Sequence, residues 1–512
     1  MAVSNCESQL IRESAHSGFT RAPSKFCLLV LLLLSLSYQP LLAAEKDITP
    51  NRPNILLIAI DDLNDWVGCL KGHPQAATPN IDHLAASGTL FTNAHCQAPV
   101  CQPSRACLLT STYPSSSGLY FLNPGIDASL ITKHKTTLPQ RFSQEGYRVF
   151  GAGKIFHVIN GAAFNKLGKY GGGFGYFGPQ PKEKISQPHG HPLWDWGAYP
   201  DTSKQMPDMQ MPDMQIAEWA AEKLETPDQD PFFLAVGFYR PHVPMLVPQK
   251  WFDQHPRENI LTPIIDADDI NDLSPYARDL TTLKHVAPLH DWIIENGQWK
   301  HAIQSYLACC SFVDSCVGKV LMALQQSSYR DNTVIVLFSD HGFHLGEKQR
   351  WAKRSLWEDG TRVPLIIAGA GLPKGQACSQ PAGLIDIYPT LLDLCHLPED
   401  SSLEGDSLMP QIADPSKRRP PVRTTFGPGN HAIRSRDWRY IRYRDGSEEL
   451  YDHRNDPHEW NNLVANTQYE DILKEHRKYL PLYEHPILGK GSTGHRAFEA
   501  AEKRRAERNR TK

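Results

Sequence analysis

The chain has 512 residues, 40% of them hydrophobic, and a formal net charge of −3 at pH 7. This length provides a large core and room for more than one domain. The near balance of 53 basic and 56 acidic residues argues against a nucleic-acid-binding protein, although one cleft can still concentrate positive charge.

The N-terminus has the layout of a secretory signal. Lys25 precedes an apolar stretch at 26–37, and Pro40 and the small residues Ala43 and Ala44 follow it. We therefore expect residues 1–44 to be a signal peptide and the protein to be exported, as a periplasmic or secreted protein. An uncleaved anchor and a later start codon are the alternatives. No later stretch is expected to span a bilayer, so no stable membrane span is expected after cleavage.

The cysteines do not indicate a disulfide scaffold. Nine of the eleven lie beyond residue 44, and neither a CxxC pair nor a zinc-type spacing occurs among them. Most are expected to be buried thiols. Cys378 and Cys395 could form a disulfide in an oxidising compartment, and the sequence alone does not decide whether they do.

Apolar runs alternate with helical patterns through residues 45–410, which we expect to form the main domain. Such runs predict a mostly parallel sheet covered by helices on both faces, an α/β fold that gathers ligands at the carboxyl ends of its strands. The expected strands are 54–60, 147–151, 232–237, 333–338 and 363–368, and the expected helices begin near 79 or cover 104–109, 216–224 and 306–324.

From about residue 411 the sequence changes character. A polar, proline-rich stretch is followed by short alternating patterns at 432–443 and 448–451, around Asp445-Gly446. These patterns predict that residues 411–512 form a small antiparallel subdomain, with a frayed basic tail at 497–512.

Polar residues cluster where the expected strands end. Asp61-Asp62 closes one apolar run, Asp340-His341 closes another, and Cys101 opens a segment that reads Cys-Gln-Pro-Ser-Arg. Carboxylates around one cysteine suggest a metal centre built around an unusual nucleophile. Taken singly, paired aspartates are often a turn or a helix cap, and a lone cysteine is more often a buried thiol.

The pentapeptide at 101–105 is the signature of the type I sulfatases, in the alkaline phosphatase superfamily. Most of residues 53–465 resembles this family, and the resemblance is closest to the iduronate-2-sulfatase branch. The supporting stretches are 153–157, 232–242, 339–347, 351–353, 438–443 and 449–457. The family's usual Leu-Thr-Gly is Leu109-Thr110-Ser111 here. The resemblance implies an alkaline-phosphatase-like sandwich with a small C-terminal antiparallel sheet.

The resemblance also implies that Cys101 is oxidised to formylglycine (3-oxoalanine) by a formylglycine-generating enzyme. The hydrated aldehyde would attack sulfur, assisted by Ca²⁺, or by Mg²⁺, on oxygen ligands. Asp61, Asp62, Asp340 and residue 101 are the implied ligands. His341 is a further implied ligand, at a position where many sulfatases carry asparagine and the iduronate-2-sulfatase branch carries histidine.

Five basic side chains receive catalytic roles from the resemblance. Arg105 would support the nucleophile, and Lys154 and His157 would contact the sulfate and take a proton. His242 would protonate the leaving oxygen, and Lys353 would stabilise its developing charge. Each residue also has a plain interpretation as a helix cap, a packed loop or solvated surface.

The resemblance implies hydrolysis of sulfated sugars, most closely an exo-acting cleavage of a uronate 2-sulfate. A sulfatase acting at another sugar position, a phosphodiesterase or phosphonate hydrolase of the same superfamily, and a non-catalytic glycan-binding protein are the alternatives. Four further residues in nearby loops receive no assigned role, and they either affect substrate selectivity or have no function: His189, His191, His344 and Arg354.

Overall fold

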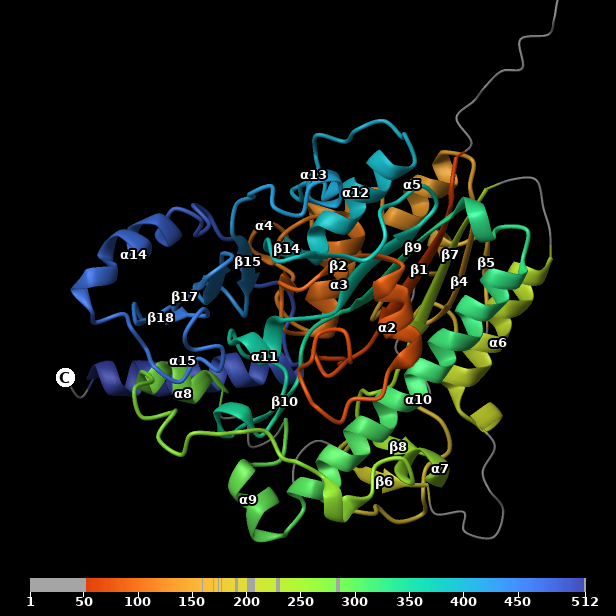
Figure 1. Ribbon diagram of the computed structural model, residues 1–512. Coiled ribbons are helices and arrows are strands. Elements are labelled where there is room, and N and C mark those ends of the chain that lie inside the picture. The colour runs from red at the N-terminus through yellow and green to blue at the C-terminus, as the bar shows by residue number, and fades with distance from the viewer. Residues whose placement is uncertain are drawn as a thin grey trace, which may run out of the picture. The chain divides into compact units, whose positions relative to one another are not determined.

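An eight-stranded mixed sheet forms the centre of the computed structural model (Figure 1), which describes residues 52–158, 160–168, 170–173, 175, 177–188, 192–199, 208–226, 231–281 and 286–510. In spatial order its strands are β13 (Gln376–Cys378), β2 (Gly88–Phe91), β12 (Leu365–Gly369), β9 (Thr333–Ser339), β1 (Asn54–Ile60), β7 (Phe232–Phe238), β4 (Arg148–Gly153) and β5 (Lys166–Leu167). The strands from β9 to β5 are parallel, and β12 runs antiparallel to both its neighbours. The expectation of a mostly parallel sheet is confirmed.

Strand β1 is buried on both faces, which explains its uninterrupted apolar sequence. Leu56, Ile58 and Ile60 belong to one hydrophobic core, and the alternate residues of the strand belong to another. Helices α2 (Pro79–Ala86), α6 (Pro212–Glu225) and α10 (Trp299–Gln326) line the first core, and α3 (Cys101–Thr110), α5 (Leu138–Gln144) and α12 (Ile387–Leu394) line the second (Figure 1).

Helix α10 is longer than the helix expected at 306–324. It is long and apolar enough to cross a bilayer by length and composition, the one such helix among the described residues. Most of its apolar window is buried within the protein, where the helix packs against α6 and α2. The same composition therefore serves a core helix, which is apolar all round because neighbours cover it.

The remaining elements connect these layers. Short ladders pair β3 (Ala94–His95) with β14 (Ala382–Gly383), β6 (Trp196–Ala198) with β8 (Met245–Val247), and β10 (His344–Leu345) with β11 (Trp351–Ala352). The short helices between them are α4 (Pro114–Ser117), α7 (Gln249–Phe252), α8 (Pro275–Thr281), α9 (His290–Glu295), α11 (Glu358–Thr361) and α13 (Met409–Ala413).

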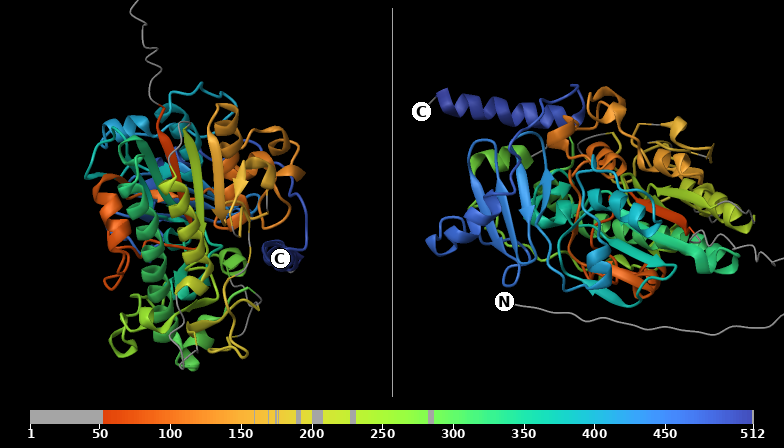
Figure 2. Two further views of the ribbon diagram at one scale, coloured as in Figure 1. Left: turned by 90° about the vertical axis from the view of Figure 1, so that its right-hand side faces the viewer. Right: turned by 90° about the horizontal axis from the view of Figure 1, so that it is seen from above.

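A second, antiparallel sheet forms in the C-terminal part, as expected. Its strands are β15 (Val422–Thr425), β16 (His431–Arg434), β17 (Trp438–Arg442) and β18 (Glu448–Asp452), in that order, and α14 (Glu470–Arg477) packs Leu473 against it. The expectation of a frayed tail was wrong for 497–510. Those residues belong to helix α15 (Thr493–Arg510), the blue helix that leads to the C-terminus in Figure 2. Phe498 and Ala501 of this helix are buried, and Arg504 pairs with Asp279.

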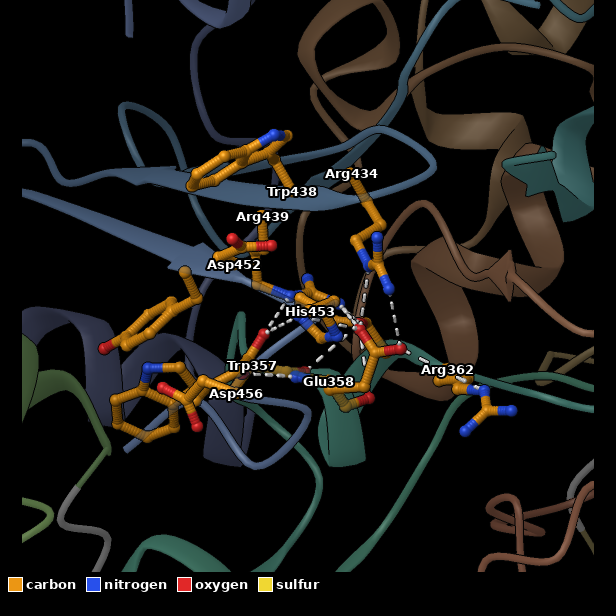
Figure 3. Close-up of polar contacts among 12 residues, drawn as sticks. Trp357, Glu358, Arg362, Arg434, Trp438, Arg439, Asp452, His453 and Asp456 are labelled. Carbon is orange, nitrogen blue, oxygen red and sulfur yellow. Dashed lines mark hydrogen bonds and ion pairs between the residues drawn. The ribbon is translucent and has the colours of Figure 1, made fainter. Parts of the chain in front are cut away.

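A buried ionic network joins α11 to the C-terminal sheet (Figure 3). Glu358 accepts a hydrogen bond from Arg434 Nε at 3.0 Å and pairs with Arg439, whose Nε lies 2.5 Å from Glu459 Oε1. His453 Nε2 contacts the same Glu459 oxygen at 2.8 Å. Each carboxylate in this network therefore has a guanidinium partner within the fold.

The structure bears on the question of a Cys378–Cys395 disulfide, but not on the expected signal peptide. Cys378 and Cys395 are both buried free thiols, so no bridge joins them. The expected signal peptide, residues 1–44, lies outside the described residues.

Candidate active site

Adjacent parallel strands bring the predicted acidic residues together at one edge of the sheet. Ile60 of β1 pairs in register with Ser339 of β9, so Asp61 and Asp340 leave neighbouring strands at the same level. Asp62 follows with φ of 64°, a left-handed conformation that aspartate tolerates better than most residues. The turn after β1 therefore directs two carboxylates toward the end of β9.

Lys154 reaches this edge from β4, and two glycines make that approach possible. Gly153 has φ of 72°, and a Cβ atom there would lie 1.9 Å from the carbonyl oxygen of Gly237 on β7. The Lys154 amide donates to that same carbonyl at 2.8 Å. Only glycine fits so close an approach of two backbones.

Helix α3 brings Cys101 to the acidic residues. The helix begins at Cys101 itself rather than near Ser104, and all ten of its residues are buried. Ser104 Oγ donates to the Asp340 carbonyl at 2.5 Å, and Arg105 Nε donates to Asp340 Oδ2 at 2.8 Å. The serine and arginine of the pentapeptide therefore hold the N-terminus of the helix against the end of β9. This N-terminus is the positive end of the helix dipole.

The predicted metal-binding side chains form one buried cluster. Ligand atoms of Asp61, Cys101, Asp340 and His341 all lie within 4.8 Å of one another, and the same holds for a set of Asp61, Asp62, Cys101 and His242. His341 Nε2 lies 3.2 Å from Cys101 Sγ and 3.4 Å from Asp62 Oδ1.

Two oxygens of this cluster fit a hard cation. Asp61 Oδ1 and Asp62 Oδ2 are buried and accept no hydrogen bond from the described residues. A buried carboxylate oxygen without a partner is costly, and a dication with oxygen ligands removes that cost. His341 Nδ1 lies 3.1 Å from the Gly342 carbonyl oxygen, which leaves Nε2 to face the cluster as an acceptor in the neutral ring. The donor set therefore fits a Ca²⁺ or Mg²⁺ site.

Three basic side chains partly neutralise the carboxylates. Lys154 Nζ lies 2.5 Å from Asp61 Oδ2, and Lys353 Nζ lies 2.5 Å from Asp62 Oδ1. Burial alone would raise the pKa of Asp61, but Lys154 and Arg105 hold it well below its usual range. Burial raises the pKa of Asp62 to about 7 against the attraction of Lys353. Of Asp61 and Asp62, Asp62 is therefore the carboxylate whose charge the neighbouring cations neutralise less.

The two predicted catalytic histidines are neutral near pH 7. Burial, with repulsion from Lys154, lowers the pKa of His157 to about 3. Burial, with repulsion from Lys353, holds the pKa of His242 well below its usual value. His242 Nδ1 lies 2.6 Å from the Val243 carbonyl oxygen, and Nε2 faces Asp62 Oδ2 at 3.9 Å. Both rings can therefore accept a proton.

A cavity of about 170 Å³ opens onto this cluster. Its polar lining comes from Asp62, Cys101, His157, His242, Lys353 and Arg354, and its apolar lining from Leu122, Leu193, Trp194, Val243, Val286, Phe343 and Ala352. Sequence reasoning missed the apolar lining because all of these residues except Ala352, which lies on β11, come from loops without a local pattern.

The other predicted residues lie in three places. Arg105 and Lys154 contact the carboxylates and do not line the cavity. His344 lies outside the cavity lining, with Nε2 2.6 Å from Ser355 Oγ. His189 and His191 lie outside the described residues.

Comparison with known proteins identifies the class. The family model described as Sulfatase matches residues 53–397, and a model described as N-sulphoglucosamine sulphohydrolase, C-terminal, matches residues 346–484. The chain therefore belongs to the sulfatase family and is a sulfuric ester hydrolase that acts on sulfated sugars.

Three similar proteins place the chain within that class. A sulfatase of Formosa agariphila is 40% identical, covering 89% of this chain and 91% of the relative. Human iduronate 2-sulfatase is 31% identical, covering 83% of this chain and 80% of the relative. The crystal structure of a phosphonate monoester hydrolase from Agrobacterium radiobacter has a TM-score of 0.66 at 20% identity, covering 84% of this chain and 95% of that one. This last likeness shows the alkaline-phosphatase-like fold.

Proposed function

We propose that the chain hydrolyses a sulfate ester with a formylglycine made from Cys101 as the nucleophile. The observation that carries this proposal is the position of Cys101, at the N-terminus of α3 and within ligand distance of two buried carboxylates. One oxygen of each carboxylate accepts no hydrogen bond from the described residues. A thiol would be a poor ligand for the hard cation that such oxygens suit, whereas the oxygens of an aldehyde hydrate would be good ones.

The residues that would hold the cation are Asp61, Asp62, Asp340 and His341, together with residue 101. A hard dication there would lower the pKa of a nearby hydroxyl group and neutralise charge on the sulfate. Arg105 pairs with Asp340 and Lys154 pairs with Asp61, so both carboxylates are oriented from behind.

The proposed reaction returns residue 101 to its starting state. One hydroxyl of the hydrated aldehyde gives up its proton to the solvent and attacks sulfur, the S–O bond to the sugar breaks, and the sugar oxygen takes up the proton that His242 carries. The second hydroxyl then loses a proton to His157, the C=O bond reforms, and inorganic sulfate leaves with its bonding electron pair. Water hydrates the aldehyde again.

His242 and Lys353 are placed to assist the leaving sugar. Lys353 lines the cavity and brings a positive charge to the place where negative charge develops on the leaving oxygen. His242 faces the same space. Burial, with repulsion from Lys353, lowers the pKa of its ring, and the negative charge of a bound sulfate ester offsets that repulsion. His242 then carries the proton that the leaving oxygen needs.

A uronate 2-sulfate is the substrate class that we propose. Arg354 lines the cavity next to Lys353, and its amide donates to the Pro99 carbonyl at 3.1 Å, close to Cys101 in the chain. Burial lowers the pKa of Arg354 to about 10, so the guanidinium remains charged at neutral pH. A planar guanidinium in a mostly apolar pocket suits a carboxylate, which a uronate carries beside its sulfate. The similarity to human iduronate 2-sulfatase supports this choice.

Replacing Arg354 by glutamine tests the substrate class. We expect kcat/KM for a 2-sulfated uronate disaccharide to fall about 100-fold, the loss of a charge-assisted bidentate contact, while kcat/KM for an aryl sulfate stays within a few-fold. Arg354→Lys retains the positive charge but cannot make a bidentate contact, so its kcat/KM for the uronate substrate should be intermediate. Equal losses of kcat/KM on both substrates would show that Arg354 does not bind the substrate carboxylate.

Several further statements remain predictions. They are the choice of Ca²⁺, oxidation of Cys101 by a separate maturation enzyme, the domain division at residues 410 and 411, and export with removal of residues 1–44. N-terminal sequencing of the secreted protein tests the last, with Glu45 as the expected first residue.

A further inference from the structure

A second group of metal-ligating side chains lies outside the cavity. His344, Glu347 and Asp359 come from β10, from the turn after it and from α11, and their ligand atoms lie within 4.8 Å of one another. His344 is fully buried, and its Nδ1 makes no hydrogen bond with any described residue. That nitrogen lies 3.8 Å from Asp359 Oδ2, a separation close to that of two ligands on one ion.

The charge of this group is not balanced by the protein. No lysine or arginine of the described chain forms an ion pair with Glu347 or Asp359, and the neighbouring Lys348 pairs with Asp269 at 2.5 Å instead. Burial raises the pKa of Glu347 to about 7, and burial together with Glu347 and Asp65 raises that of Asp359. Both shifts show that added positive charge would be stabilising here.

The network around Glu358 offers an internal comparison. It has the same kind of residues, with His453 and Glu459 in place of His344 and Glu347, but Arg434 and Arg439 neutralise it (Figure 3). The group at His344 has a similar set of ligand atoms, but no arginine among the described residues forms an ion pair with its carboxylates.

We propose that His344, Glu347 and Asp359 bind a transition-metal dication, for which Zn²⁺ is the probe. One imidazole nitrogen and two carboxylates are a ligand set that zinc accepts, whereas the oxygen-rich cluster at Cys101 suits calcium or magnesium. The Asp359 side chain is 29% exposed, which gives the ion a path from solvent and leaves room for a water ligand.

An ion at this position would support the catalytic site from outside. His344 pairs with Ala352 across the β10–β11 ladder, and Lys353 follows Ala352 directly. Binding would join α11 to the hairpin that positions Lys353 against Asp62, so the ion would be structural rather than catalytic.

Zinc binding to the full chain tests this proposal. The chelator-treated protein is saturated with Ca²⁺, dialysed against Zn²⁺ and assayed for bound zinc by elemental mass spectrometry, with the zinc dissociation constant measured by calorimetry. We expect one Zn²⁺ per chain and a rise in Tm. In Asp359→Asn and in Glu347→Gln the affinity for zinc should be about 100-fold lower and the rise in Tm absent. The exposed Asp331→Asn serves as the matched control and should behave like the wild type.

Two results would overturn the proposal. One is a wild-type chain that binds no zinc in the presence of Ca²⁺. The other is bound zinc that survives both substitutions, or that is lost only on substitution of Asp62 in the catalytic cluster. Far-ultraviolet circular dichroism of each variant distinguishes a loss of zinc binding from a loss of fold. Because Asp359 is partly exposed, Asp359→Asn should disturb the fold less than Glu347→Gln.

Discussion

The Cys101→Ala variant should have no measurable sulfatase activity, with kcat at least about 10⁴-fold below that of the wild type. The physical reason is that alanine provides neither the thiol that is oxidised nor an oxygen for the cation. Because Cys101 is buried and begins a helix, alanine also suits the position conformationally. The measurement is turnover of an aryl sulfate and of a 2-sulfated uronate disaccharide.

Cys107→Ala provides the matched control. Cys107 lies on the same helix, is buried to the same degree, and is not part of the metal-ligating cluster. We expect its activity to stay within a few-fold of the wild type. A Cys101→Ala variant that retains more than a few per cent of the activity would show that residue 101 is not the nucleophile.

The Asp62→Asn variant should lose the catalytic cation. Asparagine has nearly the same shape and tolerates the left-handed backbone at this position, so the fold should be retained. It removes the carboxylate charge that would bind the cation, at a position where Asp62 Oδ2 accepts no hydrogen bond from the described residues. We expect the affinity for Ca²⁺ to fall about 100-fold and kcat to fall about 10³-fold, since the ion contributes several kcal/mol to charge stabilisation.

Calorimetric titration of the chelator-treated protein with Ca²⁺ gives the affinity, and assays in excess Ca²⁺ separate weak binding from slow chemistry. Asp331→Asn, at the opposite end of β9, should match the wild type in both measurements. Undiminished Ca²⁺ affinity in Asp62→Asn would remove Asp62 from the proposed ligand set.

The parts of the fold that the sequence predicted are those with a local signal. Strands buried on both faces give uninterrupted apolar runs, as in Asn54–Ile60, and their ends fixed the positions of Asp61 and Asp340. The start of α3 was expected at Ser104, but the helix begins three residues earlier, at Cys101. Pro103 is compatible with this earlier start because a proline in the first turn needs no backbone N–H partner.

The parts that the sequence did not predict depend on long-range packing. Nothing local distinguishes the antiparallel β12 from its parallel neighbours. The basic composition of 497–510 suggests a solvated tail, yet Phe498 packs against Phe121 and fixes the helix. The cavity lining is likewise assembled from separate loops, so Trp194 and Phe343 had no signal that marked them in advance.

Mass spectrometry of the tryptic peptide that ends at Arg105 tests the central claim most directly. This peptide contains both Cys96 and Cys101, because no lysine or arginine lies between Lys71 and Arg105. In active protein treated with a thiol-alkylating reagent, we predict one alkylated cysteine, Cys96, and an aldehyde at residue 101 that reacts with a hydrazide. Fully active protein in which both residues are alkylated cysteines would contradict the proposed mechanism.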